Sequence, residues 1–133
     1  MSNRRIFSLV IVLLVVFVAV SGCRKQVPAD PFTGGVGTQN LSAEKVKNSI
    51  IRAGAQLGWA IVPSGKNTLI GTLRVRSHTL VMDIDYSPTV YTVRYKSSIN
   101  MEYQNGMIHP QYHTWMANLQ RQIDVELATA GTR

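Results

Sequence analysis

The sequence predicts an α+β domain of two layers, in which an antiparallel meander of three to four strands is covered on one face by an N-terminal and a C-terminal helix. Three successive segments between Leu69 and Lys96 alternate apolar and polar residues, a pattern typical of half-buried strands. The segments 42–57 and 109–127 instead repeat apolar residues at helical spacing. The expected order is therefore α-β-β-β-β-α, in one small domain over residues 41–133.

The first expected helix begins near Ser42, a favoured N-cap residue, and runs to Leu57, with Gly58 as the residue that stops it. One apolar stripe along it consists of Val46, Ile50, Ala53 and Leu57. Gly54 inside a helix costs about 1 kcal/mol relative to alanine. We therefore expect a close approach of this helix to the sheet at Gly54.

A short strand is expected over 59–62, ended by Pro63, and the meander follows it. With turns at Ser77-His78 and Ser87-Pro88, the apolar face consists of Leu69, Leu73, Val75, Leu80, Met82, Ile84, Tyr91, Val93 and Tyr95. The opposite face consists of Arg74, Arg76, Asp83, Asp85, Arg94 and Lys96. We expect cross-strand ion pairs on this polar face.

The segment after the meander contains Asn105-Gly106, a strong signal for a tight turn. Met101, Tyr103 and Met107 surround this turn and are expected to be exposed. The last helix starts around His109-Pro110, because proline suits the first helical position. Its apolar stripe consists of Tyr112, Trp115, Leu119, Ile123 and Leu127.

No residues stand out as catalytic or metal-binding. His109 and His113 are four residues apart, as in a metal-binding pair, but a third ligand is missing, so a helix cap and a surface residue are favoured. Asp83 and Asp85 could form a carboxylate pair for acid-base chemistry, but their arginine neighbours favour a charge ladder. The sequence therefore predicts a non-enzymatic protein without metal or cofactor.

Residues 24–40 are rich in proline and glycine and poor in bulky apolar residues, which predicts a flexible tether. The glycine cluster Gly34-Gly35-Val36-Gly37 superficially resembles a phosphate-binding loop. No predicted strand precedes it and no Lys-Ser/Thr pair follows it, so we interpret it as a linker.

The N-terminus has the profile of a signal peptide over residues 1–22, with Arg4 and Arg5 before an apolar run. That run of about fifteen residues is shorter than the roughly 20 that a permanent membrane span needs. Cys23 is the only cysteine in the chain, so no intramolecular disulfide can form.

The sequence Val20-Ser21-Gly22-Cys23 resembles the lipobox of bacterial lipoproteins. This resemblance implies that Cys23 carries fatty acyl groups such as palmitate and that signal peptidase II cleaves before it. Arg24 stands where an aspartate is associated with retention in the inner membrane, so the resemblance implies an outer-membrane anchor with the domain facing the periplasm. Export disfavours nucleic acid as a partner. Arg24 and Lys25 either face lipid phosphates or are ordinary solvated charges.

Residues 50–127 resemble a family of small uncharacterised proteobacterial lipoproteins. The resemblance lies in Ala53-Gly54, Gly58-Trp59 and the segments 74–78, 81–86, 95–98 and 108–119. These are packing and turn residues, so the resemblance implies a fold and no activity.

The functional expectation is a membrane-anchored accessory module that contacts another envelope protein or an anionic envelope polymer. Without Arg4 and Arg5 of the predicted signal peptide, the formal net charge falls from +7 to +5, and this positive charge is compatible with such partners. The candidate partner surface consists of Arg74, Arg76, Arg94, Lys96, Met101, Tyr103 and Met107. The alternative is a module that binds a small ligand in a cleft between the sheet and the helices.

Overall fold

The computed structural model describes residues 25–132, so the expected signal peptide, the lipobox and Cys23 lie outside the described residues. The elements are β1 (Val27–Pro28), β2 (Phe32–Gly35), α2 (Ala43–Gln56), β3 (Trp59–Gly65), β4 (Thr68–Val75), β5 (His78–Tyr86), β6 (Val90–Ile99), β7 (Met107–Ile108) and α3 (Gln111–Gly131). They confirm the α+β class.

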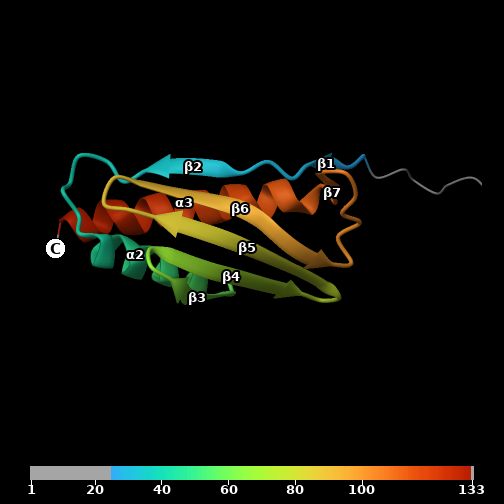
Figure 1. Ribbon diagram of the computed structural model, residues 1–133, viewed down its shortest axis with the longest axis horizontal. Helices are drawn as coiled ribbons and strands as arrows, with labels where there is room; N and C mark the ends of the chain where they lie inside the picture. Colours follow the sequence, from blue (N-terminus) through green and yellow to red (C-terminus); the bar gives the residue numbers. More distant parts are fainter. Residues whose placement is uncertain (1–24, 133) are drawn as a thin grey trace, which may run out of the picture.

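The main sheet is antiparallel and has five strands in the order β2-β6-β5-β4-β3 (Figure 1). A second, two-stranded sheet pairs β1 with β7. The expectation of three to four strands in the order α-β-β-β-β-α is therefore wrong in detail. Two strands precede the first helix, and one short strand lies between β6 and α3.

The prediction of a flexible tether over residues 24–40 is wrong for most of that segment. Val27 pairs with Ile108, and β2 adds an edge strand to β6, with Gly34 opposite Tyr91. Val36 is buried and donates its backbone N–H to the carbonyl of Thr89 at 2.9 Å. The domain thus starts before residue 41, because pairing with β6 orders a segment that buries little apolar surface of its own.

Helix α2 forms close to its predicted bounds, but Leu57, which was expected in its apolar stripe, is 36% exposed. The Ser42 side chain caps it by accepting a hydrogen bond from the backbone N–H of Lys45 at 3.2 Å, and Gly58 follows it with φ +83°. Gly54 lies against β3, where an added Cβ would come within 2.3 Å of the Cδ1 atom of Ile61. The expected close approach at Gly54 is confirmed.

The β4–β5 hairpin turns at Arg76-Ser77 and not at Ser77-His78, so Val75 pairs with His78 and Leu73 with Leu80. Arg76 adopts φ +55°, so it lies in the turn and not on the strand face. The register is shifted by two residues relative to the prediction. A two-residue shift keeps every side chain on its face, and Leu69, Leu80, Met82, Ile84, Tyr91 and Val93 are all buried as expected.

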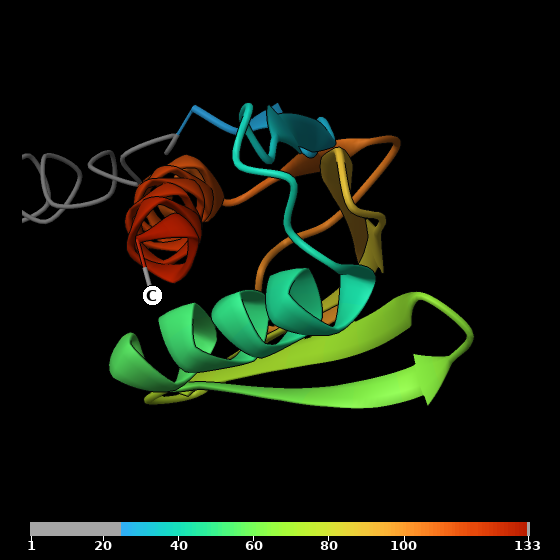
Figure 2. The ribbon, with the colours of Figure 1, turned by 90° about the vertical axis from the view of Figure 1, so that its left-hand side faces the viewer.

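Both helices lie on the concave side of the curled sheet (Figure 2). Helix α2 packs on β3 and β5, whereas α3 packs mainly on α2 and closes the side between α2 and β2. The expected pair of helices lying flat on one sheet face is thus replaced by one helix on the sheet and one beside it. The apolar side chains of both helices and of the concave face form one core.

Candidate functional site

The surface that the sequence suggested for a partner is exposed only in part in the structure. The prediction that Met101 is exposed is wrong, because only 1% of its surface is accessible to solvent. Met107 is half-buried in β7. Tyr103 is 45% exposed, and its ring stacks on that of Tyr95 with the centroids 4.1 Å apart. The segment 101–107 is thus a folded hairpin with one exposed aromatic ring.

Two of the four basic residues that the sequence assigned to the polar face form ion pairs. Lys96 Nζ lies 3.0 Å from Asp83 Oδ1, and Arg94 forms an ion pair with Asp85. These contacts confirm the predicted cross-strand ion pairs. Arg74 and Arg76 are exposed near the β4–β5 turn. Ion pairing thus offsets the charges of Arg94 and Lys96.

The histidines separate into different roles. His109 Nδ1 accepts a hydrogen bond from the backbone N–H of Gln111 at 3.1 Å, which caps the start of α3 as expected. His113 Nε2 donates to the carbonyl of Pro28 at 3.1 Å, so it ties α3 to β1. The ring of His109 lies 5.6 Å from that of His78. Within residues 25–132, no group of three or more potential ligands is placed to hold a metal ion.

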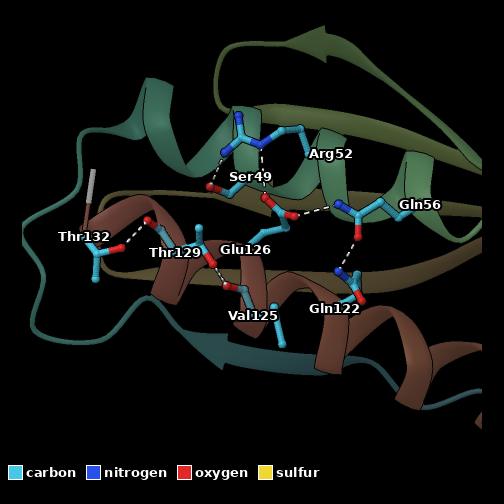
Figure 3. Close-up of polar contacts among 8 residues, drawn as sticks. All are labelled: Ser49, Arg52, Gln56, Gln122, Val125, Glu126, Thr129 and Thr132. Carbon is cyan, nitrogen blue, oxygen red and sulfur yellow. Dashed lines mark hydrogen bonds and ion pairs between the residues drawn. The ribbon is translucent and has the colours of Figure 1, made fainter.

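A polar network joins the two helices (Figure 3). The Glu126 carboxylate accepts hydrogen bonds from Arg52 Nε at 3.1 Å and from Gln56 Nε2 at 2.7 Å. Gln56 Oε1 in turn accepts one from Gln122, and Arg52 also donates to Ser49. Because these groups satisfy one another, the network fixes the contact between α2 and α3.

A groove lies on the other side of α3, between that helix and β2. Its volume is about 390 Å³. On the strand side it is lined by Thr33, Gly34, Gly35, Val36, Gly37 and Gln39, and on the helix side by Gln120, Asp124, Leu127 and Ala128. It combines exposed backbone, two side-chain amides and one carboxylate.

Asp124, which lines the groove, also ties α3 to strand β6. The hydroxyl of Tyr91 donates a hydrogen bond to Asp124 Oδ1 at 2.8 Å. Burial, together with this hydrogen bond and the charge of Asp124, raises the pKa of the Tyr91 phenol above its ordinary value. Tyr91 fits here because Gly34 has no side chain: a Cβ at Gly34 would lie 2.3 Å from the Tyr91 hydroxyl oxygen.

The backbone of β2 faces the groove with its unpaired edge. β2 is the last strand of the sheet, and the N–H of Val36 points toward β6. In an antiparallel ladder the N–H and C=O groups alternate in direction along a strand. Those of Gly34 therefore also point toward β6, and those of Thr33 and Gly35 point outward to the free edge.

The sequence suggests a cleft between the sheet and the helices only in general terms and does not identify the residues of this groove. Gln120 and Asp124 lie one helical turn apart on the polar side of α3, where nothing in the sequence distinguishes them from solvated residues. Gly34 and Gly35 were interpreted as linker residues. The alternation of Phe32, Gly34 and Val36 was the only sign of a strand.

The fold and the groove define a small α+β domain with an exposed sheet edge beside its C-terminal helix. No family model, no curated protein and no solved structure matches the chain. Among residues 25–132, no helix has the length and apolar character needed to cross a membrane.

Proposed function

We propose that this chain is a non-enzymatic lipoprotein, anchored to the outer membrane through Cys23 and facing the periplasm, that binds an extended segment of another envelope protein in the groove between β2 and α3. The observation that carries this proposal is the outward-facing edge of β2 in the wall of that groove. The anchor is supported by the lipobox residues Val20, Ser21 and Gly22 before Cys23.

The binding mode that suits this geometry is strand addition. An extended peptide beside β2 would exchange backbone hydrogen bonds with Thr33 and Gly35, which gives affinity with little dependence on sequence. Gly35 leaves the outer face of β2 uncrowded, since a Cβ there would meet no atom within 4 Å. Gln120 and Asp124 on the opposite wall would then select among peptides, with the carboxylate favouring basic or N–H-rich side chains.

The anchor is tested by labelling the full chain in a Gram-negative host with a fatty-acid analogue. The wild-type protein should take up the label and be processed, whereas Cys23→Ser should take up none and accumulate as the precursor. A Cys23→Ser protein that still matures and sediments with membranes would refute the lipoprotein assignment.

The groove is tested by placing a photo-crosslinking residue at Gln120, which lines it, and separately at Arg121, which does not. A partner should crosslink from Gln120 and not from Arg121. Gly35→Pro removes an outward backbone donor and should abolish the crosslink, whereas Gly35→Ala keeps that donor and should retain it. Equal crosslinking from both positions, unaffected by Gly35→Pro, would argue against strand addition.

The second candidate function is small-ligand binding in the same groove. Its volume of about 390 Å³ falls within the range usual for small-ligand pockets. Native mass spectrometry of protein purified from the envelope distinguishes the two. A bound small mass that disappears in Asp124→Ala favours this second candidate over a peptide partner.

A further inference from the structure

Very few residues separate Cys23, the proposed site of the lipid anchor, from the folded domain. Val27 is already paired with Ile108 in the small sheet of β1 and β7. Only four peptide units separate Cys23 from Val27, and a fully extended chain of that length spans at most about 14 Å. If Cys23 is acylated, the end of the domain that contains β1 must therefore lie at the lipid headgroups.

Several segments far apart in the sequence meet at that end of the molecule (Figure 1). They are β1, β7, the start of α3, the β4–β5 turn and the end of β6. Gln26 donates a side-chain hydrogen bond to the carbonyl of Glu102, and Asn100 donates one to the hydroxyl of Ser77 at 2.7 Å. The first contact joins the first described residues to the hairpin 101–107, and the second joins the residue after β6 to the β4–β5 turn.

The exposed side chains at this end are of the kinds that suit a membrane interface. Ile99 is the most exposed of the large apolar residues in the described chain, at 65%, and Tyr103 is 45% exposed. Lys25 and Arg76 are exposed basic residues beside them, and Glu102 is the acidic residue among them. Tyrosine is enriched at the level of lipid headgroups, and lysine and arginine are attracted to anionic lipids.

We infer that this end, defined by Lys25, Arg76, Ile99 and Tyr103, rests on the phospholipid surface that carries the anchor. The inference rests on the proposed acylation of Cys23. It gives the domain a fixed orientation, with the β3–β4 turn at the far end, because β4 and β5 run away from the β4–β5 turn. The groove between β2 and α3 then lies along the side of the domain and stays open to the periplasm.

The test uses full-length protein purified from membranes and reconstituted into vesicles of phosphatidylethanolamine and phosphatidylglycerol. A fluorophore is attached to Ile99→Cys or, as the matched control, to Lys66→Cys in the β3–β4 turn. Both positions are exposed, so neither change should disturb folding. Headgroup spin-labelled lipids should quench the label at position 99 several-fold more than the label at position 66.

A second variant tests the chemistry of the contact. Arg76→Glu in the Ile99→Cys background should reduce quenching at position 99, because a new acidic group would face anionic lipid. Equal quenching at positions 99 and 66, with lipid on Cys23 verified by mass spectrometry, would overturn the inferred orientation and leave the lipoprotein proposal intact. Absence of lipid on Cys23 would overturn both.

Discussion

Tyr91 on β6 and Asp124 on α3 share a hydrogen bond of 2.8 Å, although they lie 33 residues apart in the sequence. This bond attaches α3 to the sheet on the side where β2 forms the edge. The ring of Tyr91 is fully buried against Gly34, so the same residue positions both walls of the groove.

Removal of this hydroxyl should weaken the attachment of α3. A hydrogen bond to a charged group contributes about 1.5–3 kcal/mol. Because Asp124 is exposed, Tyr91→Phe should lower the free energy of unfolding by about 1.5 kcal/mol, the lower end of this range. Chemical denaturation followed by circular dichroism measures it. Tyr103→Phe is the control, since Tyr103 is exposed. Equal stability of Tyr91→Phe and wild type would show that the bond contributes nothing.

Stability should also fall at alkaline pH. Burial, together with the charge of Asp30, raises the pKa of Tyr112 from 10.0 to about 12, and the pKa of Tyr91 is raised as well, mainly by burial. A raised pKa means that the unfolded state loses these protons first, so the stabilisation is complete below pH 10 and is lost as pH rises through the folded-state pKa. Denaturation midpoints should fall between pH 10 and 12, and the double variant Tyr91→Phe, Tyr112→Phe should show a flatter profile.

Gly34 and Gly35 are neighbours with opposite expected sensitivity. An added methyl group at Gly34 would overlap the ring of Tyr91, so Gly34→Ala should cost about 1–3 kcal/mol, as overpacking of a core usually does. Gly35→Ala meets no neighbour within 4 Å and should stay within about 0.5 kcal/mol of wild type. Thermal denaturation measures the melting temperatures of both variants, and that of Gly34→Ala should be the lower. Similar melting temperatures would mean that β2 does not pack against Tyr91.

The helix–helix network should contribute more than a surface ion pair. The Glu126 side chain is only 13% exposed and accepts hydrogen bonds from Arg52 and Gln56. Glu126→Ala should therefore cost about 1–2 kcal/mol. Glu44 forms an ion pair with Lys47 but is 68% exposed, so Glu44→Ala is the matched control, with a smaller expected loss of stability. Comparable losses in urea denaturation would mean that the network is no stronger than the surface pair.

The parts of the fold that the sequence predicted have strong local signals. Ser42 and Gly58 mark the ends of α2, and Asn105-Gly106 forms the expected turn with positive φ at both residues. The faces of β4, β5 and β6 follow from strict alternation. Each of these signals depends on residues close together in the chain.

The parts that sequence reasoning missed depend on contacts between distant segments. β2 contains two glycines and few apolar atoms, and it is ordered because β6 lies beside it. Met101 lies in a segment whose composition is typical of a surface loop. It is nevertheless buried in the core, because the hairpin 101–107 folds against the start of α3. The backbone N–H of His109 donates to the carbonyl of Met101 at 2.9 Å. The residues of the groove were missed for the same reason, since β2 and α3 meet only in the tertiary structure.

β2 is a folded edge strand, with one side paired with β6 and the other open to the groove. Amide hydrogen exchange of the full chain, resolved by residue, tests this arrangement. The N–H groups of Gly34 and Val36 face β6 and should exchange slowly, whereas those of Thr33 and Gly35 should exchange rapidly. Rapid exchange at all four residues, as in a flexible tether, would contradict this arrangement.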